Sequence, residues 1–259
     1  MKYKTKLLAD RFVSVLSQWP GVECITLNEA ARSDTLDPYY AFILDIFHSG
    51  PIPQGAERRG QYGEDTAAFE TSSRGDKDRF LIGEIPVRLE YKATQKIDEL
   101  VSYADTKLDS LWFIKDSGTY GFYRLAHGEI LFSRNTWIRD IRERLNNLDN
   151  EFWRQIRDAH QSKMEHFLND LGAALFQGDD FHYLISSALF IKTACLTLFC
   201  INHRFEPSHR GYYKQVIGLP VLPESFAAQL GTFLSSEAEI TQERKYSLAQ
   251  LIARGIVSL

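Results

Sequence analysis

The stretch that decides the fold runs from Leu27 to Phe47 and reads LNEAARSDTLDPYYAFILDIF. It begins with a polar segment, Asn28 to Pro38, and ends in an apolar run, Tyr40 to Phe47, which has the length and composition of a β-strand. An acidic residue in an apolar strand is costly to bury alone. We therefore expect Asp45 to have a charged partner, to bind a cation, or to lie at a strand end.

A second strand, predicted over residues 87–92 (VRLEYK), also presents a carboxylate. Alternating side chains put Arg88, Glu90 and Lys92 on one face of this strand. If the two strands are neighbours, Asp45 and Glu90 come within reach of one ion, and Mg²⁺ typically takes one or two protein carboxylates together with substrate phosphates. Arg79, Arg88 and Lys92 would then neutralise a polyphosphate.

A simpler interpretation stays open for both carboxylates. The face with Arg88, Glu90 and Lys92 is also typical of a solvated strand face, where each cross-strand ion pair contributes under about 1 kcal/mol. Asp45 alone is compatible with a turn at the end of its strand.

Hydrophobic periodicity and turn residues divide the first 148 residues into mixed elements. Pro20-Gly21 ends the first helix, and the dense Gly, Pro and charged residues of 49–78 indicate a long functional loop. We predict helices over 1–19, 94–106 and 133–148, strands over 22–27, 40–47, 111–114 and 121–132, and a hairpin formed by 79–82 and 85–92.

Beyond this region every element is helical in pattern, over 150–176, 180–202, 223–236 and 241–258. The change in pattern near Asn146-Asn147 is where we place a domain boundary. The predicted fold class is α+β: a mixed-sheet domain over residues 1–147 followed by an all-α helical bundle over 148–259.

Composition excludes several classes of protein. The 30 basic and 34 acidic residues give a formal net charge of −4, which argues against bulk binding of nucleic acid. Three cysteines are too few for a disulfide framework and indicate reduced thiols in a cytoplasmic protein. The apolar segment 181–201 carries Lys192 at its middle, so we expect a buried bundle helix and no membrane span.

The order of helix, strand, LNEAARSD, polar loop and a strand ending ILDIF resembles the polymerase-β-like nucleotidyltransferase superfamily. Within it, the chain looks most like two-domain bacterial proteins that include the group called DUF4037. The family pattern is Gly-Ser, two residues, Arg-Gly, a loop, then Asp-x-Asp on the second strand and a third carboxylate on a later strand.

The resemblance implies roles for particular residues. Asp45 matches the second Asp of Asp-x-Asp and Glu90 the third carboxylate, so both become candidate catalytic residues and magnesium ligands. Asn28, Arg32 and Ser33 match positions of the phosphate-binding turn. Together with Arg79, Arg88 and Lys92 they are the candidate contacts to ATP or another nucleoside triphosphate.

The sequence departs from the family pattern at three places. Asn28-Glu29 replaces Gly-Ser, Ser33 replaces the second glycine, and Ile43 stands at the first Asp, which normally bridges both metals. Two carboxylates are left where the family has three.

Three interpretations of function follow. The first is a nucleotidyltransferase-like protein that binds a nucleoside triphosphate and Mg²⁺ in the interdomain cleft and, if active, transfers a nucleoside monophosphate to the hydroxyl of an unknown acceptor. The alternative is a catalytically degenerate member of the fold that acts as a ligand- or protein-binding module, with its carboxylates paired to Arg88 or Lys92. A third interpretation is a partner protein whose helical domain supplies the interface.

Overall fold

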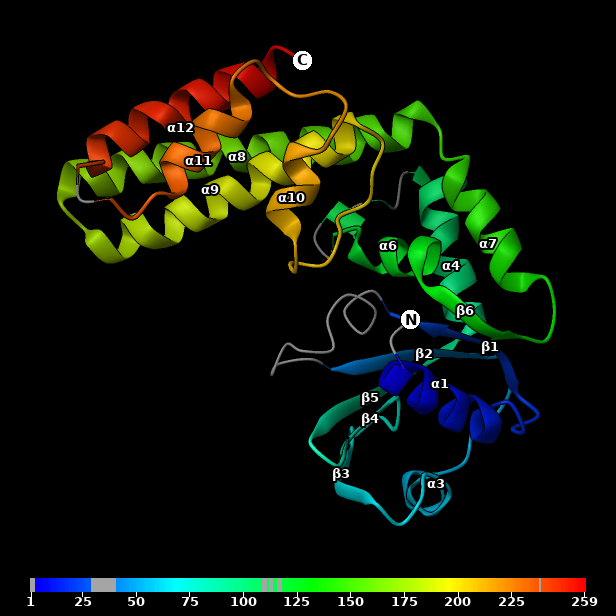
Figure 1. The fold of residues 1–259 in the computed structure, drawn as a ribbon. Coiled ribbons are helices and arrows are strands. Elements are labelled where there is room, and N and C mark those ends of the chain that lie inside the picture. The colour runs from blue at the N-terminus through cyan, green and yellow to red at the C-terminus, as the bar shows by residue number, and fades with distance from the viewer. Residues whose placement is uncertain (1–2, 29–40, 109–110, 112–113, 116–117, 238) are drawn as a thin grey trace. The chain divides into compact units, whose positions relative to one another are not determined.

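The computed structural model describes residues 3–28, 41–108, 111, 114–115, 118–237 and 239–259. The chain forms two compact units (Figure 1). Unit 1 comprises residues 1–107 and 121–147, and unit 2 comprises residues 108–120 and 148–259. The fold class is α+β, as predicted, with a mixed sheet in unit 1 and helices in unit 2.

Unit 1 is built on a six-stranded sheet of order β3-β4-β5-β2-β1-β6. All neighbouring strands are antiparallel except β2 and β5, which are parallel. Because β2 lies inside the sheet, six of its seven residues are buried. The strands are β1 (Val22–Leu27), β2 (Phe42–His48), β3 (Thr66–Thr71), β4 (Lys77–Ile82), β5 (Ile85–Ala93) and β6 (Glu129–Ser133).

Helix α1 (Tyr3–Leu16) covers one face of this sheet, as Figure 1 shows in blue. Phe12 and Leu16 of α1 pack with Leu44 of β2 and Leu89 of β5 in one buried cluster. On the other face, Phe47 of β2 packs against the ring of Trp137, with ring centroids 5.2 Å apart. Trp137 begins α7 (Trp137–Asn146), which packs on α4 (Thr94–Asp105).

The predicted hairpin is confirmed, because β4 and β5 pair antiparallel around a turn in which Gly83 has a φ of +58°. The predicted loop over 49–78 is wrong in part: it contains α3 (Gly55–Gln61) and the edge strand β3. The strand predicted over 121–132 is also wrong in part, since α6 (Tyr120–His127) precedes β6. Phe122 and Leu125, one helical turn apart, are both buried, so packing overrides the β-propensity of this aromatic segment.

A buried polar network holds α3 against β4. Arg58 of α3 donates two hydrogen bonds to Asp78, at 2.8 Å and 2.7 Å, and both side chains are almost fully buried. The hydroxyls of Tyr62 and Tyr91 also donate to Asp78, at 2.8 Å and 2.9 Å. The carboxylate is thereby fully hydrogen-bonded, which is the condition under which a charge can be buried.

Unit 2 is a helical bundle, in which α8 and α9 form an antiparallel pair that packs with α12 (Figure 1). Side chains of Asp149, Asp179 and Thr241 accept backbone N–H groups at the N-termini of the three helices. Gly178, with a φ of +66°, ends α8. The bundle helices are α8 (Asn150–Gln177), α9 (Asp180–Ile201), α10 (Tyr212–Ile217), α11 (Phe226–Leu234) and α12 (Gln242–Val257).

Candidate functional site

The parallel pairing of β2 and β5 brings the two candidate carboxylates together. Asp45 lies directly opposite Glu90 in the register, and Ile43 and Phe47 lie opposite Arg88 and Lys92. Residues paired across neighbouring strands share a face, so Asp45 and Glu90 project to the same side of the sheet.

Asp45 is only 2% exposed and is surrounded by cations. Arg124 of α6 holds it through two hydrogen bonds, one from Nε to Oδ2 at 3.0 Å and one from Nη2 to Oδ1. The ammonium of Lys92 lies 2.9 Å from the same Oδ1. The Asp45 carboxylate therefore has its charge neutralised inside unit 1.

Glu90 shares the same guanidinium, because Nη1 of Arg124 lies 3.0 Å from Oε2 of Glu90. Lys77 and Lys92 each place an ammonium 3.6 Å from this carboxylate. Burial is the largest single influence on the pKa of Glu90 and raises it. The charges of Arg124, Lys92 and Lys77 together outweigh burial and hold the pKa below its ordinary value.

These contacts do not fit the magnesium ion that the sequence analysis implies. A divalent cation between Asp45 and Glu90 would lie beside the guanidinium of Arg124 and would compete with it for the same oxygens. Ile43, which the resemblance aligns with the first Asp of Asp-x-Asp, is apolar and cannot bind a metal. Within the described part of the chain, no three His, Cys, Asp or Glu side chains converge as a metal site would require.

Arg79 and Arg88, two of the candidate phosphate contacts, lie on the same face as Asp45. They are opposite each other in the β4–β5 register, and Lys77 is opposite Glu90. No described residue forms an ion pair with Arg79 or Arg88. Glu70 of β3 is opposite Arg79, so this face has a third carboxylate. The basic side chains of the face still outnumber its acidic ones.

Asn28 directly follows β1 and lies beside Ile43 in the same site. Its backbone N–H donates to the carbonyl of Ile43 at 3.0 Å, and its side chain is 3% exposed. Among the described residues, neither its Nδ2 nor its Oδ1 has a hydrogen-bond partner. An orphaned buried amide is costly, and a bound polar group would satisfy it. Arg32 and Ser33, the other candidate turn residues, lie outside the described residues.

Arg124 is the residue that the sequence reasoning missed. It stands 79 positions after Asp45 and lies in the segment expected to be a strand. No local motif marks it. The signal available in the sequence is indirect: a buried acidic residue on β2 requires a cation from somewhere in the chain.

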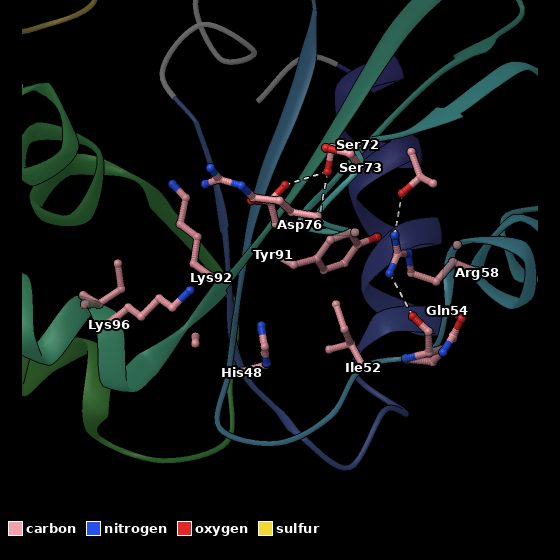
Figure 2. Close-up of a pocket in the computed structure, with 17 residues that line it drawn as sticks. His48, Ile52, Gln54, Arg58, Ser72, Ser73, Asp76, Tyr91, Lys92 and Lys96 are labelled. Atoms are coloured by element: carbon pink, nitrogen blue, oxygen red, sulfur yellow. Dashed lines mark hydrogen bonds between the residues drawn. The ribbon is translucent and has the colours of Figure 1, made fainter.

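A second feature of unit 1 is a pocket of about 810 Å³ at the C-terminal ends of β2 and β5 (Figure 2). Its walls come from the segment after β2, the β3–β4 turn and the start of α4. Four basic side chains and one acidic side chain line it, with apolar and hydroxyl groups between them. The lining includes His48, Ile52, Arg58, Ser72, Arg74, Asp76, Tyr91, Lys92, Lys96 and Ile97.

Unit 2 contains a smaller pocket of about 430 Å³, lined in part by Lys192, Glu206 and Arg210. Burial raises the pKa of Glu206 above its ordinary value, and the charges of Lys192 and His209 oppose that rise. Lys192 itself is exposed.

Helix α9, which includes the apolar segment 181–201, is long and apolar enough to cross a membrane, with a mean hydropathy of 2.0 in its most apolar window. In the structure 56% of that window is buried inside the protein. Buried core helices have the same length and composition, so this feature is weak evidence for a membrane span.

The chain is similar to a solved nucleotidyltransferase-like protein from Exiguobacterium sibiricum 255-15, with 12% identity and a TM-score of 0.51. The match covers 98% of this chain and 74% of that chain. No family model and no curated protein matches the sequence. At this identity the similarity establishes a nucleotidyltransferase-like fold alone, and the narrower resemblance to DUF4037-type proteins stays a prediction.

Proposed function

We propose that unit 1 is a ligand-binding module of nucleotidyltransferase-like fold that does not carry out metal-dependent nucleotidyl transfer. The observation that supports this is the pairing of Asp45 and Glu90 with one guanidinium, that of Arg124. In this arrangement an internal cation holds the two carboxylates that the resemblance assigns to a metal ion.

The energetics support the same proposal. Asp45 and Arg124 are both largely buried, and separating a buried ion pair by removing one partner costs roughly 3–5 kcal/mol. A magnesium ion would have to displace Arg124 and also lose part of its own hydration shell, which it does reluctantly. Because Arg124 and Lys92 already neutralise the two carboxylates, the electrostatic attraction between them and Mg²⁺ is weak.

Calorimetry tests this proposal. We expect titration of the protein with MgATP to show no binding that requires both Mg²⁺ and Asp45. We also expect radiolabelled ATP to transfer no nucleotidyl group to a panel of hydroxyl acceptors. Asp45→Asn is compared with Asp140→Asn, which removes an exposed carboxylate from α7. Mg²⁺-dependent binding that Asp45→Asn abolishes and Asp140→Asn preserves would overturn the proposal.

Metal-dependent nucleotidyl transfer is the second candidate, and Asn28 is the observation in its favour. Among the described residues the buried amide of Asn28 beside Ile43 has no partner. The resemblance assigns this position to the turn that binds the terminal phosphates of the nucleotide. This candidate requires Arg124 and Lys92 to release the two carboxylates when ligand binds. It predicts that Asn28→Ala weakens MgATP binding as Asp45→Asn does.

A further inference from the structure

We infer that the 810 Å³ pocket at the ends of β2 and β5 is a binding site for an organic phosphate, with a mono- or diphosphate group joined to an apolar or aromatic body. This inference rests on the proposed function, because it names the ligand class of the binding module. It concerns a different set of side chains from the Asp45 and Glu90 pair.

The charge of the pocket favours an anion. Of its four Arg and Lys side chains, Arg58 is tied to Asp78 and Lys92 to Asp45. Arg74 and Lys96 are exposed and have no ion-pair partner among the described residues. Two positive charges are therefore available to a ligand.

The single acidic side chain of the lining, Asp76, keeps its negative charge, so one of the two available positive charges is left in excess. Asp76 accepts a hydrogen bond from the hydroxyl of Ser72 at 2.6 Å, as Figure 2 shows. The Ser72 oxygen in turn accepts the backbone N–H groups of Asp76 and Lys77, both at 3.1 Å. Gly75, with a φ of +69°, completes this turn, and the hydrogen bond from Ser72 fixes the orientation of the Asp76 carboxylate.

Lys96 lies in the first turn of α4, where a cation is unfavourable because the helix dipole places positive charge at this end. The cap residue Ala93 has no side chain that could accept the free N–H groups of that turn. A bound phosphate would accept from these N–H groups and pair with Lys96, so it would offset both costs.

His48 adds a further polar group to the same wall. Its Nδ1 donates to the carbonyl of Gly50 at 2.7 Å, so its other ring nitrogen is available to the pocket. In Figure 2 Lys92 and Lys96 lie on one side of the pocket, and Ile52, Gln54 and Arg58 lie on the other.

The apolar lining argues for an organic ligand over inorganic phosphate. Ile52, Pro53 and Ile97 contribute apolar surface to the walls. The volume of about 810 Å³ lies within the range of about 300–1,000 Å³ typical of small-molecule sites. The combination of two available cations, Arg74 and Lys96, with an apolar wall suits a phosphate attached to a flat or aliphatic body.

The test uses ADP as the probe, in the presence of EDTA and at low ionic strength, with binding followed by calorimetry on the full chain. We expect ADP to bind, and Arg74→Ala combined with Lys96→Ala to weaken it at least tenfold. The matched control combines Lys107→Ala with Arg139→Ala, which removes two exposed charges of unit 1 outside the pocket. We expect the control to bind as the wild type does. Circular dichroism checks that both double variants are folded.

Adenosine tests the contribution of the organic body to binding, and inorganic phosphate tests that of the phosphate group. We expect both to bind more weakly than ADP. Absence of ADP binding, equal binding by both double variants, or an adenosine or phosphate affinity equal to that of ADP would each overturn the inference. The proposed function fails on a different result, namely Mg²⁺-dependent binding that Asp45→Asn abolishes.

Discussion

Replacing Arg124 with Gln tests the central ion-pair cluster directly. The guanidinium contacts both Asp45 and Glu90, and its side chain is only 13% exposed. Removing one partner of a buried pair costs roughly 3–5 kcal/mol. Lys92 remains 2.9 Å from Asp45 and compensates in part, so we expect the free energy of unfolding of unit 1 to fall by about 3 kcal/mol.

Urea denaturation followed by circular dichroism at pH 7 measures this loss, and thermal unfolding should show a drop of roughly 10 °C. Arg139→Gln is the control, because Arg139 is exposed and forms no ion pair with a described residue. Arg124→Lys keeps the charge but loses the planar fork, and we expect an intermediate loss.

The pH dependence gives an independent readout. The pKa of Glu90 is lowered in the folded state, so its pairing stabilises the protein above the unfolded pKa of about 4.3. That contribution is lost as pH falls through the folded pKa. The difference between wild type and Arg124→Gln should therefore shrink below about pH 4. A loss at pH 7 under about 1 kcal/mol, equal to that of the control, would refute the assignment of Arg124 as the internal counter-ion.

Three further predictions concern other buried or strained groups. Asp78→Asn should destabilise unit 1 by roughly 3–5 kcal/mol in urea unfolding because it leaves Arg58 buried without its carboxylate, and a neutral effect would contradict the network. Burial lowers the pKa of His160 to about 4, so protonation favours unfolding as pH falls from 6.5 toward 4. The resulting loss should be about 2 kcal/mol between pH 7 and 5. His160→Gln should abolish this slope, and an unchanged slope would rule out His160 as its source. Gly178→Ala should cost about 1 kcal/mol by thermal melting, because φ is +66° and no neighbour would touch the added methyl group; a stabilised variant would argue against that conformation.

Much of the fold follows from local signals. Pro20-Gly21 and Gly83-Glu84 mark chain reversals, and the predicted helices over 150–176 and 241–258 are confirmed within two residues at each end. Helix α6 was missed because its aromatic residues favour a strand, and only packing of Phe122 and Leu125 makes it helical.

Part of the candidate site follows from the alternation of side chains along β2 and β5. The period of two placed Asp45 and Glu90 on matching faces, and the register confirms that they are opposite each other. Arg124 could not be predicted, because its contact with Asp45 spans 79 positions and depends on how α6 docks. The 810 Å³ pocket could not be predicted either, since its walls come from three segments that meet only in the folded sheet.

The excursion of residues 108–120 into unit 2 has a consequence for how the protein is made. Unit 1 is not contiguous in the chain, because β6 and Arg124 come after the excursion. During synthesis, one edge of β1 stays unpaired until β6 has left the ribosome. The ion pairs of Asp45 and Glu90 with Arg124 also form only after residue 124 has been synthesised. A nascent chain that ends at residue 107 therefore has a bare edge on β1, and its two buried carboxylates are balanced by Lys77 and Lys92 alone. Residues 121–133 supply both the missing strand and the missing guanidinium.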